Sequence, residues 1–71
     1  MEKEKIAGLE YLFNCYSFRI ALHKDKKEEN LASMVALEMA VNLFGYKFEF
    51  KGMAKSNGTV YKEFELVEIN E

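Results

Sequence analysis

The sequence predicts a small α+β domain, a single unit over residues 1–71, with its elements in the order α-β-α-β-β. A segment with helix-forming residues and signals for both helix ends, residues 26–44, lies in the middle of the chain. Three stretches alternate between apolar and polar side chains, as half-buried strands do: residues 16–23, 46–51 and 60–69. Together they predict a three-stranded antiparallel sheet in the order 2-3-1, packed on the central helix.

The first element is predicted to be a helix over residues 2–13, because Ile6, Leu9, Leu12 and Phe13 fall on one helical face. The next stretch, residues 14–24, fits two structures. As a continuation of the first helix it would produce a helical hairpin followed by a β-hairpin. As a strand it alternates strictly, and its aromatic residues favour that structure. We therefore expect the strand, with the helical hairpin as the alternative. The alternating residues are Tyr16, Phe18, Ile20 and Leu22 against Ser17, Arg19, Ala21 and His23.

The central helix has a start signal and a stop signal. Asp25, followed three residues later by Glu28, matches a capping box. Gly45 stands where a left-handed residue commonly ends a helix. The apolar side chains form two stripes, and a helix that is apolar on both sides is normally buried on both sides. One stripe holds Leu31, Val35, Met39 and Leu43, and the other holds Met34, Leu37, Val41 and Phe44.

One stripe is predicted to pack on the sheet, and the other to meet a second protein chain. We assign the partner interface to the second stripe, with Glu38 at its edge. Glu38 could pair there with a lysine or arginine, but a solvent-facing position without a role is the favoured interpretation. The predicted partner interface is Met34, Leu37, Val41, Phe44 and Glu38.

Two strands are predicted after the helix. Tyr46, Phe48 and Phe50 alternate with charged residues, which is typical of a half-buried strand. The pair Asn57-Gly58 predicts a tight turn, and the last strand follows over residues 60–69. The three predicted strands share an aromatic inner face and a charged outer face.

The composition excludes several kinds of site. One cysteine and one histidine can form neither an intrachain disulfide nor a zinc site, so we expect no metal or cofactor. Cys15 and His23 would be roughly 26 Å apart on a strand or roughly 12 Å apart in a helix, too far for a catalytic pair. No apolar run is long enough to span a membrane, and no signal peptide is recognisable. We expect a cytoplasmic protein that is not an enzyme.

A chain of this length buries only about 60% of its unfolded surface, so oligomerisation or partner binding is expected to stabilise it. We therefore predict a protein-interaction module, an inhibitor, adaptor or assembly factor that acts as a homodimer or on a larger protein. The lysine-rich composition, without proline or tryptophan, suits an A+T-rich bacterium or its phage. The alternative is a nucleic-acid-binding domain, which the net charge of −2 disfavours. It would use the outer sheet face, with Arg19, His23, Lys47, Lys51 and Tyr61.

Overall fold

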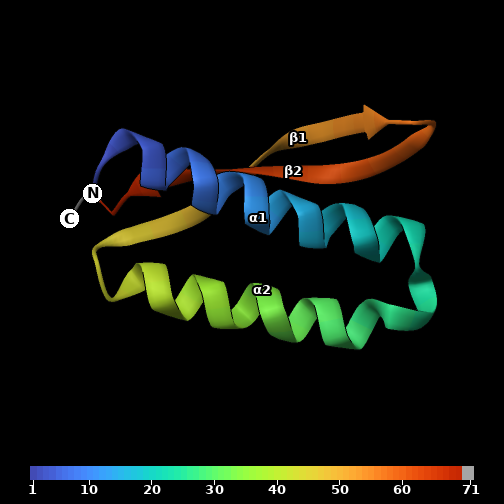
Figure 1. The fold of residues 1–71 in the computed structure, drawn as a ribbon, viewed down its shortest axis with the longest axis horizontal. Helices are drawn as coiled ribbons and strands as arrows, with labels where there is room; N and C mark the ends of the chain where they lie inside the picture. The colour runs from blue at the N-terminus through green and yellow to red at the C-terminus, as the bar shows by residue number, and fades with distance from the viewer. Residues whose placement is uncertain (70–71) are drawn as a thin grey trace.

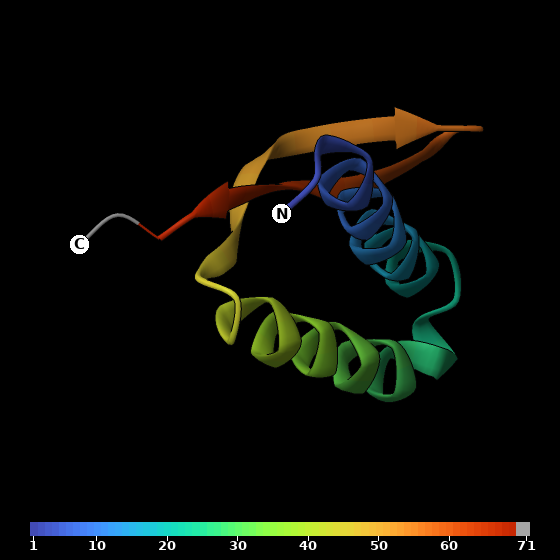
Figure 2. The ribbon, with the colours of Figure 1, turned by 60° about the vertical axis from the view of Figure 1, so that its left-hand side comes forward.

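The computed structural model describes residues 1–69 as a helical hairpin followed by a β-hairpin (Figure 1). The two helices are antiparallel, and α1 contacts both α2 and β2 (Figures 1 and 2). The chain is therefore a small α+β domain, with the element order of the predicted alternative. The elements are α1 (Lys3–Leu22), the 3-10 turn η1 (Lys24–Lys26), α2 (Lys27–Asn42), β1 (Tyr46–Ser56) and β2 (Thr59–Glu68).

The strand predicted over residues 16–23 is wrong, because α1 continues without a break to Leu22. The alternation that suggested a strand has another cause. Tyr16 and Ile20 pack against the core on one flank of α1, whereas Phe18 contacts Tyr61 on the other flank, with 5.4 Å between ring centroids. A helix that uses two flanks can place apolar residues at alternate positions. Within residues 1–69 the sheet thus has two strands, not the three predicted in the order 2-3-1.

The β-hairpin turn and the glycine signal for the end of α2 follow the sequence closely. Asn57 and Gly58 have φ angles of 49° and 82°, the left-handed values that a two-residue hairpin turn requires. Gly45, with φ 82°, follows α2 as predicted. Asp25 does not form the predicted cap, since it lies within η1 and no side chain caps α2. The ladder pairs Phe48 with Leu66 and Phe50 with Phe64, and a register shift follows between Phe50 and Gly52.

The core lies between α1, α2 and the inner face of the hairpin. The ring of Phe13 stacks on Phe48, with 3.7 Å between centroids, and meets Phe64 edge-on at 5.1 Å. The buried apolar residues are Phe13, Met34, Val41, Tyr46, Phe48 and Leu66. Among the described residues, no helix has the length and apolarity needed to cross a membrane.

Polar side chains of α1 cover the outer edge of β2. The Asn14 amide donates to the Phe64 carbonyl at 2.9 Å and accepts from the Phe64 N–H at 2.8 Å. A Glu10 carboxylate oxygen accepts from the Leu66 N–H at 3.2 Å. The Ser17 hydroxyl donates to the Lys62 carbonyl. Because Glu10, Asn14 and Ser17 lie one helical turn apart on one face, α1 satisfies the backbone of β2 much as a neighbouring strand would.

The hydrogen bonds along the β2 edge are expected to stabilise the fold. Asn14→Ala removes both partners of Phe64 and leaves partly buried backbone groups unpaired, which we expect to lower the free energy of unfolding by about 2–3 kcal/mol. The matched control is Asn30→Ala, because the Asn30 amide bonds the Lys26 carbonyl on the exposed surface; its effect should stay within about 0.5 kcal/mol. Urea denaturation measures both. Equal losses in the two variants would contradict a role of Asn14 in closing the β2 edge.

Candidate interaction surface

One side of α2 is apolar and open to solvent. Leu31, Val35, Met39 and Leu43 recur every four positions, and Phe44 follows Leu43 directly. The exposed fractions of these side chains are large for apolar residues of this size. They are Leu31 41%, Val35 55%, Met39 65%, Leu43 86% and Phe44 73%. We call these five residues the α2 face.

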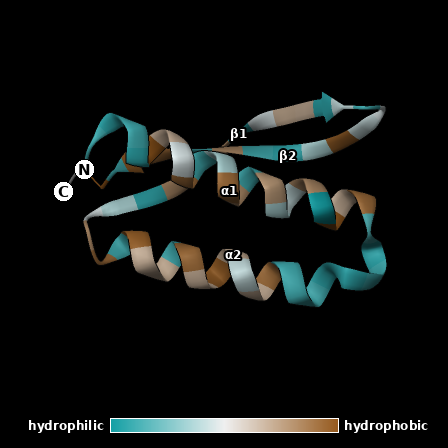
Figure 3. Ribbon diagram, viewed as in Figure 1, coloured by the Kyte–Doolittle hydropathy of each residue, from teal (hydrophilic) through white to brown (hydrophobic). Residues whose placement is uncertain are grey.

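The surroundings of the α2 face contain little charge. Ala32, Ala36 and Ala40 are exposed and extend its apolar surface. Colouring by hydropathy shows the middle and C-terminal part of α2 as largely apolar and its start as polar (Figure 3). After Glu29 the helix carries one charged residue, Glu38, and its last turn has no basic residue. An exposed apolar surface of this extent marks a contact site more often than a solvated surface.

The partner interface predicted from the sequence falls largely in the core. Met34 and Val41 are 8% and 2% exposed, and Leu37 is half-buried against the same cluster. Phe44 and Glu38 are exposed as an interface requires. The assignment of the stripes is therefore corrected, because α1 is longer than predicted and covers the stripe of Met34, Leu37 and Val41. The stripe left uncovered is the one expected to meet the sheet.

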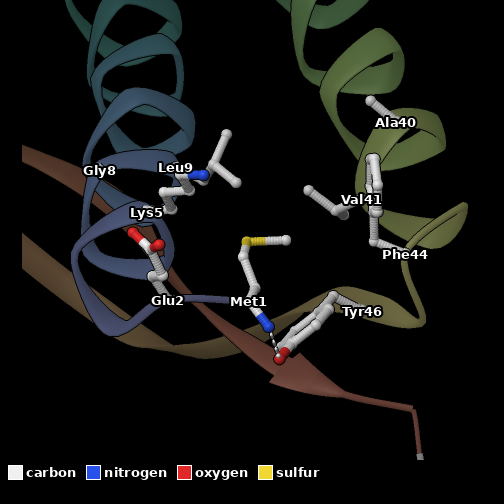
Figure 4. A pocket seen from close by; sticks show the side chains of 9 residues that line it. All are labelled: Met1, Glu2, Lys5, Gly8, Leu9, Ala40, Val41, Phe44 and Tyr46. Atoms are coloured by element: carbon white, nitrogen blue, oxygen red, sulfur yellow. Dashed lines mark hydrogen bonds between the residues drawn. The ribbon is translucent and has the colours of Figure 1, made fainter.

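A groove lies beside the C-terminal end of the α2 face, between the start of α1 and the end of α2 (Figure 4). Its volume is about 920 Å³ and its wall is mostly apolar. The Tyr46 hydroxyl lies 3.3 Å from both the Met1 amine and a Glu68 carboxylate oxygen. Burial of the ring, together with the charge of Glu68, raises the pKa of Tyr46. The lining residues are Met1, Glu2, Lys5, Gly8, Leu9, Ala40, Val41, Phe44 and Tyr46.

The residues proposed for an outer sheet face do not form one surface. Arg19 and His23 belong to the end of α1 and the turn after it, not to a strand. Together with Tyr61 they line a second groove, of about 480 Å³, between α1 and the hairpin tip. The Tyr61 ring is engaged there by Phe18. Lys47 and Lys51 are exposed on β1 and do not line this groove.

Neither groove brings together a recognisable catalytic group. Tyr11 and Cys15 lie one turn apart on α1, and the nearby Cys15 thiol raises the pKa of Tyr11. Within residues 1–69, no three His, Cys, Asp or Glu side chains are placed to hold a metal ion. The most distinctive surface that the described chain offers is therefore the α2 face.

The fold and this surface define a small α+β protein, a helical hairpin followed by a β-hairpin, with one apolar helix side exposed. No model of a known protein family, no curated protein and no solved structure matches the chain.

Proposed function

We propose that the protein is a non-enzymatic interaction module that self-associates through the α2 face and acts as an inhibitor, adaptor or assembly factor. The observation that carries the proposal is the exposure of five large apolar side chains along α2 and in the turn that follows it. Within residues 1–69 no other element covers this surface, and a second copy of the chain could bury it. The proposal keeps the cytoplasmic setting, which suits a free cysteine such as Cys15.

The exposed area agrees with a missing subunit. The folded chain exposes 5278 Å². A compact monomer of 8.3 kDa is expected to expose about 4,600 Å² by the usual scaling of surface with mass. The excess, roughly 700 Å², is close to the share of about 800 Å² that one partner contributes to a standard interface.

A second copy of the chain fits the α2 face. When two α2 helices pack antiparallel about a two-fold axis, Leu31 of one copy faces Leu43 of the other, and Val35 faces Met39. The exposed alanines allow the close approach of about 8 Å that small interface residues permit. Antiparallel packing also places Lys26 and Lys27 near the negative end of the other helix, which has no basic residue of its own.

A substitution of the most exposed stripe residues tests this proposal. We expect Met39→Glu with Leu43→Glu to weaken self-association at least about 100-fold, because the carboxylate at position 39 would be buried beside Val35 of the other copy without a partner, and the one at position 43 would replace the apolar contact with Leu31. The fold should be retained, since both side chains are exposed in the single chain. Sedimentation equilibrium over a range of concentrations measures the association, and circular dichroism checks the fold.

Tyr11→Glu is the matched control for this test. Tyr11 is 74% exposed on α1, so the variant replaces an equally exposed apolar residue outside the α2 face. It should associate like the wild type. A wild-type chain that stays monomeric at all concentrations would contradict the proposal, and so would a double variant that associates as the wild type does.

The nucleic-acid alternative has less support in the structure. It needs a continuous basic surface, yet Arg19 and His23 are separated from the sheet and Tyr61 is packed on Phe18. The Lys47 ammonium nitrogen lies 3.6 Å from a Glu49 carboxylate oxygen, which reduces the positive potential around Lys47. We therefore do not propose it as a second function.

A further inference from the structure

The two edges of the β-hairpin differ in their hydrogen bonds to the rest of the described chain. The backbone groups of Phe64 and the N–H of Leu66 point away from β1, toward α1. In an antiparallel ladder this identifies the pairs Phe50–Phe64 and Phe48–Leu66 as the non-hydrogen-bonded type. The N–H and C=O groups of Phe48 and Phe50 must then point away from β2 as well, toward the outer edge of β1. Tyr46, in register two residues earlier, follows the same rule.

That outer edge of β1 has no counterpart to the cover that α1 gives to β2. In the described part of the chain, the structure contains no hydrogen bond from another element to the backbone of residues 46–50. The edge is interrupted only after Phe50, where the register shift toward Gly52 ends the regular ladder. Of the two strands of the hairpin, β2 is the one along which α1 lies. Such a row of free donors and acceptors is a site for strand addition.

We propose that residues 46–50 of β1 bind an extended segment of a partner protein as a third, antiparallel strand. The bound segment would exchange backbone hydrogen bonds with Tyr46, Phe48 and Phe50. The site lies on the hairpin edge and uses no residue of the α2 face, so it goes beyond self-association. A self-associated protein would present this edge once per copy.

The charges of the strands indicate the chemistry of the partner segment. β1 carries Lys47, Lys51 and Lys55 against one acid, Glu49, whereas the chain as a whole has a net charge of −2. The strand already paired with it, β2, is acidic, and Glu49 stands opposite Glu65 in the ladder. In this ladder Lys47 stands opposite Val67, so β2 places no acid opposite that lysine. An added strand with acidic side chains beside Lys47 and Lys51 would supply the opposite charge.

A second copy of β1 is a poor occupant of the same edge. It would bring a further set of lysines onto one sheet face, and lysines at an edge are a known device against self-pairing. On the inner face of the sheet, the added strand would meet the ring of Phe50, which is 56% exposed and lies 5.9 Å from the Phe64 ring between centroids. This surface favours apolar side chains on the added strand. The fitting partner is therefore an extended segment with alternating acidic and apolar residues.

The test uses a synthetic heptapeptide of alternating glutamate and valine, acetylated and amidated at its ends. It is added to the isotope-labelled full chain, and amide hydrogen exchange is followed by NMR. We expect the amides of Tyr46, Phe48 and Phe50 to exchange about tenfold more slowly with saturating peptide. A peptide of alternating lysine and valine is the charge control and should have no effect. N-methylation of the peptide amides that face β1 should abolish the effect, whereas N-methylation of the other amides should not.

Three results would overturn the proposal: no protection at saturating peptide, protection centred on α1 or α2, and equal protection by the lysine peptide. A fourth is slow exchange of these amides in the free protein that depends on its concentration, because it would show that a second copy occupies the edge. The titration is repeated on the Met39→Glu, Leu43→Glu variant. Since that variant carries two charges on the α2 face and should not self-associate, its result separates a failure of strand addition from a failure of self-association.

Discussion

Val41→Asp is expected to leave the chain largely unfolded at 25 °C. Val41 is the least exposed residue of the core, at 2%, and from α2 it joins the cluster that contains Phe13 of α1 and Tyr46 of β1. A carboxylate there would lose its hydration without a partner, at a cost of several kcal/mol. A domain of this length has a total stability of only about 4–10 kcal/mol. Circular dichroism and thermal unfolding measure the loss.

Val35→Asp is the matched control, with the same substitution on the same helix. Val35 is 55% exposed, so its aspartate stays hydrated and the chain should fold. The comparison cancels the low helix propensity of aspartate, because both positions lie inside α2. If Val41→Asp folded and Val35→Asp did not, the stripe of Val35 would be the buried one and the stripe of Val41 the exposed one. That is the assignment predicted from the sequence.

Phe13→Ala is expected to lower the free energy of unfolding by about 3–5 kcal/mol. The ring is 4% exposed and contacts two strands at once, stacked on Phe48 and edge-on to Phe64. Its removal leaves a cavity at the junction of α1 with the hairpin. It also removes two aromatic pairs, which stabilise the fold by more than their buried area alone would. Urea unfolding monitored by circular dichroism gives the value.

Leu12→Ala serves as the comparison. Leu12 precedes Phe13 on α1, but its side chain is 41% exposed and lies outside the core cluster. It should lose about 1 kcal/mol or less. A loss in Phe13→Ala no larger than in Leu12→Ala would show that the stacked rings do not hold the helix on the hairpin.

The parts of the fold with local signals could be predicted from the sequence. The β-hairpin depends on Asn57-Gly58, whose left-handed conformations are encoded by the residues themselves. The end of α2 depends in the same way on Gly45. Residues 16–22 could not be assigned, because their structure depends on which other element they contact. The polar row Glu10, Asn14 and Ser17 was the available signal for a helix, since these residues share a face only at helical spacing.

The candidate interaction surface could be predicted in kind but not in place. Two apolar stripes on one helix indicated that one of them would lack a partner within the chain. Both stripes hold four large apolar residues, so composition did not distinguish them. The choice depended on whether α1 extended far enough to cover Met34 and Leu37, which is a tertiary property. The covered edge of β2 was likewise beyond sequence reasoning, since it joins residues 45 to 56 positions apart.

The most direct test of self-association through the α2 face is an NMR measurement on a mixed sample. One half of the protein is labelled with ¹³C, the other half is unlabelled, and only contacts between copies are recorded. The proposed antiparallel packing predicts cross-peaks between the methyl groups of Leu31 in one copy and Leu43 in the other, and between Val35 and Met39. Cross-peaks confined to other surfaces, or none at concentrations where the mass of the particle is that of a dimer, would contradict it.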